Sequence, residues 1–201
     1  GACNYWQYVI AAALGGGAGI RMTLPAFFLS LLHTVDPGRV PLSTEGEWLT
    51  YAGVTSLLGL LVLVETIADM VPALDHLLHV VLAPLHPVMG ALAALAVDLC
   101  GGWTARAPVA LVAGLLAFGV HSGKATLRAV GSGASCGTLN PCLSGCESIG
   151  VVLLMAVSIL FPVVGLGALA LFACLACQGL QAWSSASAYA ASRKRPAVAD
   201  L

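Results

Sequence analysis

Residues 48–64 read WLTYAGVTSLLGLLVLV, an apolar run that contains no charged side chain. A helix needs about 20 predominantly apolar residues to cross the hydrocarbon core of a bilayer. This run, which continues into Glu65 and Asp69, therefore predicts a membrane-spanning helix. Trp48 at its start is typical of the aromatic belt at a membrane surface.

The rest of the chain has the same character. Hydrophobic residues make up 59% of its 201 residues and charged residues only 8%, whereas about a quarter of a soluble domain is charged. Lipid must therefore cover much of the surface. We predict an all-α, polytopic transmembrane helical bundle of about six membrane-embedded segments. The net charge of −1 does not suggest a basic surface for binding nucleic acid. The expected partner is the lipid bilayer.

The first apolar segment, residues 5–34, is interrupted by glycines at 15–19 and by Pro25. A straight helix of this length would measure about 45 Å, against a hydrocarbon core of about 30 Å. Glycine and proline are typical places for a helix to break. We therefore predict a broken first helix whose two halves meet within the membrane, with the break between Gly15 and Pro25.

The later segments are less regular. A short apolar stretch between Pro72 and Pro84 suits an interfacial or re-entrant piece, and residues 131–145 read as a Gly/Ser/Cys loop. Residues 148–192 contain no charge, and we divide them into two helices near Phe161–Pro162. Further helical segments are expected at 87–99 and 107–120.

These segments form a single predicted domain over residues 1–192, followed by a basic tail at 193–201. Arg193, Lys194 and Arg195 place the C-terminus on the cytosolic, stromal or matrix side by the positive-inside rule. The first residue is Gly1, and alanine and glycine are abundant. We expect an integral protein of a chloroplast or other organellar membrane, with a bacterial inner membrane as the alternative.

Charged residues within apolar segments are costly and often functional. The candidates for a substrate or ion site are Arg21, Glu65, Asp69 and Asp75. The residues expected to support this site are Gly19, Pro25, Pro72, Lys124 and Arg128. Glu65 and Asp69 are four residues apart and share one helix face. A carboxylate pair there either binds a cation or a proton, or pairs with Arg21 as a structural staple. Both interpretations remain open, and both predict that Arg21 lies within salt-bridge reach of a carboxylate.

The glycines beside Arg21 also allow two interpretations. Broken helices in transporters expose helix ends that bind ions or anionic groups, and Gly19 lies where such an end would be. Glycines in membrane helices also allow close helix packing.

Histidines 76, 79 and 86 match no closed metal site, and we read them as interfacial. Cys136, Cys142 and Cys146 are compatible with a disulfide, whereas Cys174 and Cys177 are read as small buried thiols. We find no nucleophile elbow, phosphate-binding loop or dinucleotide fingerprint. We therefore predict a protein that is not an enzyme and has neither a cofactor nor a metal.

Four short motifs occur in order along the chain. They are Gly19-Ile20-Arg21 with Leu24-Pro25; Glu65, Asp69, Pro72 and Asp75; His121, Lys124 and Arg128; and Ser144 with Glu147. These motifs resemble those of the domain-of-unknown-function 4126 family of small multi-pass membrane proteins. The resemblance implies a membrane bundle, and the family has no established activity. Met70 is a departure, since a lysine is expected after Asp69.

The chain also has a weak internal symmetry. Basic residues follow a glycine at Arg21 and again at Lys124 and Arg128, and Glu47 and Glu147 each open an apolar segment. This pattern is compatible with an inverted repeat. The leading hypothesis is a transporter of an ion or small solute, organised as a homo-oligomer. The alternative is a non-catalytic accessory subunit of a larger photosynthetic or translocon-type complex.

Overall fold

The computed structural model describes residues 5–71, 81–135 and 140–161 without a gap, together with separate positions at 74, 77 and between 164 and 185. Within this part of the chain every regular element is helical, in agreement with the predicted all-α class. A 3₁₀ helix, η1, covers Thr44–Thr50, and an isolated antiparallel bridge pairs Leu42 with Val97. The α-helices are α1 (Trp6–Ile20), α2 (Leu24–Val35), α3 (Ala52–Met70), α5 (Leu85–Leu95), α6 (Trp103–Ser135) and α7 (Asn140–Leu160).

Among the described residues, three helical segments are long and apolar enough to cross a membrane. They are α3, Trp103–Thr126 of α6, and Cys142–Leu160 of α7. Helices α2 and α5 are apolar but shorter. Only 17% of the α3 span is buried, and large apolar side chains such as Leu60, Leu63 and Ile67 point away from the bundle. These features fit an integral membrane protein.

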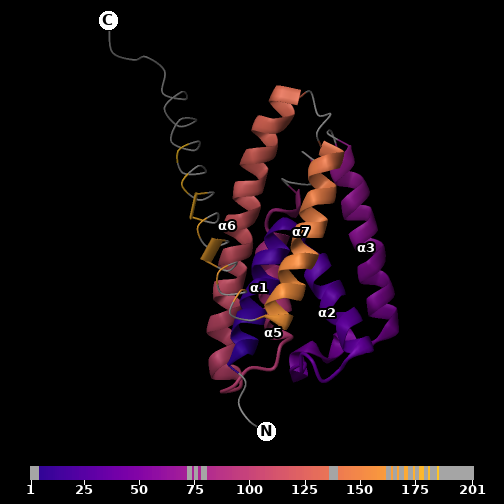
Figure 1. Ribbon diagram of the computed structural model, residues 1–201, viewed down its shortest axis with the longest axis vertical. Coiled ribbons are helices and arrows are strands. Elements are labelled where there is room, and N and C mark those ends of the chain that lie inside the picture. The colour runs from indigo at the N-terminus through magenta and orange to yellow at the C-terminus, as the bar shows by residue number, and fades with distance from the viewer. Residues whose placement is uncertain are drawn as a thin grey trace, which may run out of the picture.

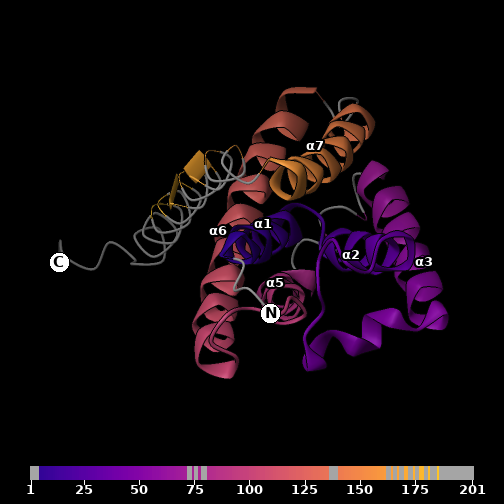
Figure 2. The ribbon, with the colours of Figure 1, turned by 60° about the horizontal axis from the view of Figure 1, so that its bottom comes forward.

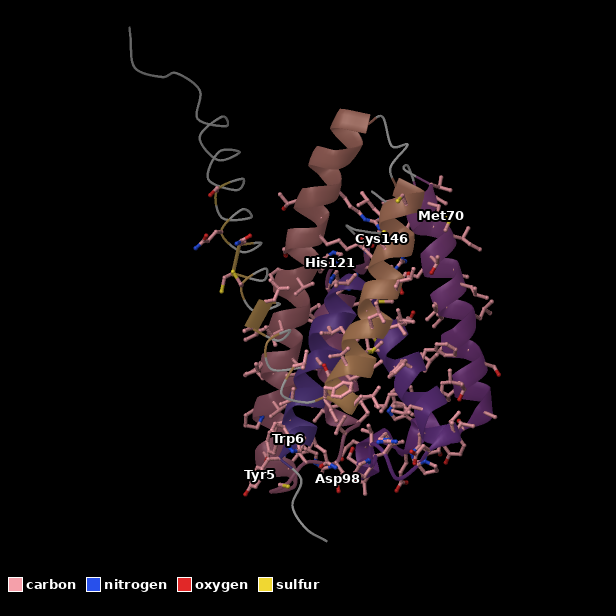
Figure 3. The ribbon with its side chains drawn as sticks, in the orientation of Figure 1. Tyr5, Trp6, Met70, Asp98, His121 and Cys146 are labelled. Atoms are coloured by element: carbon pink, nitrogen blue, oxygen red, sulfur yellow. The ribbon has the colours of Figure 1, made fainter. Side chains whose placement is uncertain are left out.

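Helices α1 and α2 form a hairpin. The Tyr8 hydroxyl on α1 donates a hydrogen bond to the Cys100 carbonyl, and Leu42, which follows α2, pairs with Val97. The outer ends of both helices therefore lie at the same end of the bundle, which also contains the labelled Tyr5 and Asp98 (Figure 3). The break was predicted between Gly15 and Pro25, and it lies at residues 21–23.

Helix α1 is the centre of the bundle, with α2, α5, α6 and α7 around it (Figure 2). Its glycines allow this packing. A Cβ on Gly15 would lie 2.4 Å from the Ala113 Cβ, and one on Gly19 would lie 2.5 Å from the Ala117 carbonyl oxygen. Real Cβ atoms are not found at such distances, so α1 and α6 approach closely only because these residues are glycine.

Helices α6 and α7, which can be followed in Figure 1, correct one prediction. Residues 131–145 were expected to be a loop, but α6 continues to Ser135 and α7 begins at Asn140. Small and hydroxyl side chains do not prevent a membrane helix from continuing, because the backbone still satisfies its own hydrogen bonds. Asn140-Pro141 is a typical helix start that the sequence interpretation missed. Helix α7 ends at Leu160, as the division near Phe161 predicted.

Candidate functional site

The tip of the α1–α2 hairpin, residues 21–23, is non-helical backbone inside the bundle. Arg21 has φ −133° and ψ 109°, and both Arg21 and Thr23 are almost fully buried. A break of this kind leaves unpaired carbonyl groups at the end of α1 and unpaired N–H groups at the start of α2. Because the tip is buried inside the bundle, side chains from other helices must satisfy these groups.

Glu65 of α3 satisfies the N–H groups at the start of α2. Its Oε1 accepts a hydrogen bond from the Met22 N–H at 2.8 Å, and its Oε2 accepts from the Thr23 N–H at 3.3 Å and the Thr23 hydroxyl at 2.9 Å. The positive end of the helix dipole favours a carboxylate here. Glu65 therefore holds the hairpin tip through its backbone.

Two side chains satisfy carbonyl groups at the end of α1. Lys124 of α6 donates from Nζ to the Ile20 oxygen at 2.7 Å, and His86 of α5 donates from Nδ1 to the Ala18 oxygen at 2.7 Å. A cation at the C-terminal end of a helix is favoured by the helix dipole. The broken helix is thus capped at both of its inner ends by ionisable side chains.

Five charged residues, Arg21, Asp69, Lys124, Arg128 and Glu147, form a connected group that we call the ionic cluster. The Asp69 Oδ2 lies 3.0 Å from Arg21 Nη1, 3.2 Å from Arg128 Nη2 and 3.3 Å from Lys124 Nζ. Arg128 donates hydrogen bonds to both carboxylate oxygens of Glu147, from Nε at 3.0 Å and from Nη2 at 2.6 Å. Lys124 Nζ lies 3.1 Å from Glu147 Oε2. The cluster joins the hairpin tip to α3, α6 and α7.

Arg21 is the most enclosed member of the cluster, with a side chain that is 1% exposed. Its Nη2 donates to the carbonyl oxygen of Ser144 at 2.9 Å and to the Ser144 hydroxyl. Its Nε is buried and makes no hydrogen bond to any part of the chain that the structure describes. One strong donor of the cluster is therefore left for a water molecule or a ligand.

The ionic cluster lies toward one end of the bundle. Asp69 is one residue before the end of α3, Lys124 is near the end of the α6 span, and Ser144 and Glu147 are near the start of α7. Met70 and Cys146 mark the same end in Figure 3. Arg21 lies at the tip of the α1–α2 hairpin, at the opposite end from Tyr8.

The structure brings together most of the predicted site residues. Arg21 contacts Asp69, as predicted, and Lys124 and Arg128, proposed only as supporting residues, bind the same carboxylate. Gly19 packs against α6, and Pro25 lies in the first turn of α2. Pro72, Asp75, His76, His79, Cys136 and the tail at 193–201 lie outside the described residues.

The sequence interpretation missed Glu147 and Ser144 as members of the site. They lie three residues apart on α7 and both face the hairpin tip through contacts with Arg21, Lys124 and Arg128. Their spacing, which places a hydroxyl and a carboxylate on one face just before an apolar helix, was the available signal. Ser144 and Glu147 form one of the family motifs. However, Ser144 is more than 120 residues from Arg21 in the sequence, so spacing could not predict their contact.

Histidine and cysteine positions differ from their predictions. His86 was expected at the membrane interface, but it is 4% exposed and stacks on His121. Cys142 and Cys146 are free thiols. Cys174 and Cys177, predicted to be buried, are exposed and free. Nearby Val164 and Leu171 are exposed as well, so these thiols lie among side chains that the bundle does not cover.

Comparison with known proteins agrees with the motifs of the site. A family model described as a domain of unknown function, DUF4126, matches residues 8–182. No curated protein and no solved structure matches the chain. The matched range includes every residue of the ionic cluster, all of α2, and α1 from Tyr8 onward. The chain therefore belongs to the DUF4126 family.

Proposed function

We propose that this protein is a small membrane transporter that moves an ion or a small solute past the ionic cluster. The observation that carries the proposal is the hairpin tip, where non-helical backbone is buried and held by ionisable side chains from α3, α5 and α6. Transporters use discontinuous helices of this kind to bind ions and anionic groups. Charges at membrane depth are costly, and they often mark a solute path.

In this proposal the ionic cluster is a gate at one end of the bundle. It joins four separate helical units, so the end is closed while its pairs are made. Its three cations and two carboxylates leave an excess of one positive charge, and the Arg21 Nε provides a buried donor. A solute that pairs with Arg21 would weaken its contact with Asp69 and allow the hairpin to move relative to α3.

A second function is favoured by the outer surface of α3. This helix exposes a row of large apolar side chains, and only 17% of its span is buried in the chain. A surface of this kind suits either lipid or another subunit. An accessory subunit of a larger membrane complex would use α3 for docking and the ionic cluster as a structural staple.

Reconstitution into vesicles of phosphatidylcholine and phosphatidylglycerol tests the transport proposal. Gradients of H⁺, Na⁺, K⁺ and Cl⁻ are imposed in turn, and flux is recorded with fluorescent indicators inside the vesicles. We expect flux of at least one of these ions above that of empty vesicles. Glu65→Gln and Asp69→Asn should abolish it, whereas Asp36→Asn, in an exposed loop pair with Arg39, should leave it unchanged.

Size-exclusion chromatography of each variant shows that any loss of flux occurs in folded protein. Flux that is equal in the wild type and in both cluster variants would contradict the assigned path. If no ion crosses, and the wild-type protein migrates with a much larger assembly after mild extraction, the accessory-subunit function replaces the transporter.

A further inference from the structure

Two histidines form a buried pair next to the ionic cluster. His86 of α5 and His121 of α6 are 4% and 3% exposed. Their ring centroids are 3.8 Å apart and their planes differ by 26°, so the rings are stacked. Figure 3 shows His121 in the half of the bundle that contains Cys146, the half occupied by the cluster. We call these two residues the histidine pair.

The hydrogen bond of His86 defines where its protons can be. A carbonyl oxygen only accepts hydrogen bonds, so the Nδ1 that lies 2.7 Å from the Ala18 oxygen carries a hydrogen. In a neutral imidazole the other nitrogen, Nε2, is then the acceptor. A further proton on His86 must bind at Nε2, and it would convert the ring to an imidazolium.

The histidine pair is linked to the ionic cluster through α6 and through the end of α1. His121 and Lys124 are three residues apart on α6, and the same helix continues to Arg128 one turn later. His86 and Lys124 also bind carbonyl groups only two residues apart, at Ala18 and Ile20 at the end of α1. His86 of the pair and Lys124 of the cluster therefore bind the same end of the same helix.

The other ionisable groups on the helices around the pair also have partners. On α1 the ionisable side chain is Tyr8, at the opposite end, where it bonds the Cys100 carbonyl. Arg21 follows α1 and pairs with Asp69 of α3. Glu65 of α3 binds the tip, and Glu147 of α7 binds Lys124 and Arg128. Helix α5 contains no ionisable residue besides His86.

We propose that the histidine pair binds one proton, and that this proton is the coupling ion of the transporter. The second statement rests on the proposed function, whereas the first does not. One proton is taken from water on one side of the membrane to an imidazole nitrogen of the pair. It is later released to water on the other side, with no other bond formed or broken.

The stacking limits the pair to one proton. Two imidazolium rings with centroids 3.8 Å apart would repel strongly in a medium of low dielectric constant. A single added charge acts on the gate through the adjacent Lys124. It opposes the ammonium group, weakens the Lys124 bonds to Asp69 and the Ile20 carbonyl, and frees the end of α1 to move. Histidine is suited to this role because it changes charge near neutral pH.

Proton binding is tested by ¹⁵N NMR of histidine-labelled full-length protein in lipid nanodiscs, titrated from about pH 5 to about pH 8. His86→Gln and His121→Phe assign the resonances. The glutamine amide can still donate to Ala18, and the phenyl ring can still stack. In the wild type, the ¹⁵N chemical shifts of both rings should change over the same pH range, because the two rings share one proton. In each variant the midpoint of the remaining histidine should move by about one pH unit or more.

His33→Gln is the matched control, because His33 lies on α2 and is not part of the stacked pair. It should leave the titration of the pair unchanged. Two results would overturn the proton site: neither ring titrates in this range, or each titrates with a midpoint that is insensitive to loss of the other.

Coupling is tested separately in the vesicles described above, with pyranine reporting the internal pH. An ion that the wild type transports should move a proton with it, and His121→Phe should abolish proton movement. If ion flux persists with no proton movement, coupling is wrong and the transporter remains. If the wild type moves no ion at all, the proposed function fails, while the NMR titration still decides whether the pair binds a proton.

Discussion

Asp69→Asn is the sharpest perturbation of the ionic cluster, because one oxygen of this carboxylate contacts three cations. At about 3 Å and an effective dielectric constant of about 20, a single ion pair is worth roughly 5 kcal/mol before desolvation is subtracted. The three contacts do not add, because Arg128 and Lys124 also bind Glu147 and Arg21 also binds Ser144.

Loss of one partner of a buried ion pair typically costs about 3–5 kcal/mol. The remaining contacts place Asp69→Asn near the lower limit, so we expect the free energy of unfolding to fall by about 3 kcal/mol. A change of 1 kcal/mol shifts the melting temperature of a protein of this size by about 2–4 °C. The expected decrease in melting temperature is therefore roughly 6–12 °C.

Thermal unfolding in mild detergent, followed by tryptophan fluorescence, measures this decrease. Asp36→Asn is the matched control, since Asp36 and Arg39 form a pair whose side chains are 48% and 51% exposed. It should change the melting temperature by no more than about 2 °C. Combining Asp69→Asn with Arg21→Gln should cost less than the sum of the single changes by about 1–3 kcal/mol.

Two results would refute this reasoning. A loss below about 1 kcal/mol in Asp69→Asn would mean that the carboxylate is not a buried partner of the three cations. Strictly additive effects of the two substitutions would mean that Arg21 and Asp69 do not interact.

Three further substitutions test neighbouring features. Gly19→Ala should destabilise the protein by about 1–3 kcal/mol, since its Cβ would overlap the α6 backbone, whereas Gly53→Ala, whose Cβ meets nothing within 4 Å, should not lower the melting temperature. Glu65→Gln should cost about 1–3 kcal/mol in thermal unfolding, because an amide oxygen replaces only part of the hydrogen bonding of the carboxylate to the hairpin tip. The same change at Glu47, on η1, is its control and should have little effect. Met70→Lys, which introduces the residue expected in the family, should shift the melting temperature by no more than about 2 °C, because the Met70 side chain is exposed at the end of α3.

Much of the helical architecture could be predicted, with errors at defined places. The charge-free run at 48–64 predicted the helix that became α3, although Trp48 belongs to η1. The glycines and Pro25 located the break in the first helix. The loop expected at 131–145 was wrong because composition suggested a turn where backbone bonding continued α6 to Ser135. About six membrane-embedded segments and an inverted repeat stay predictions.

The site could be predicted only in part. Spacing put Glu65 and Asp69 on one face of a helix, and the cost of a buried charge required a carboxylate near Arg21. Spacing could not assign the partners. Glu65 binds the backbone of the hairpin tip, and Asp69 binds the guanidinium group. Glu65 and Asp69 are one turn apart on α3 and have different partners. Which part of the hairpin each carboxylate reaches depends on how α3 packs against it.

The sequence by itself determined that this is a membrane bundle, because 8% charged residues cannot cover a protein in water. It also predicted where the first helix breaks and that Arg21 lies within salt-bridge reach of a carboxylate. Only the tertiary structure decided that α1 and α2 form a hairpin, that Glu147 completes the ionic cluster, and that His86 meets His121. Local composition and periodicity specify helices and their faces. Contacts between segments tens of residues apart depend on close packing, here on the glycines that let α1 approach α6.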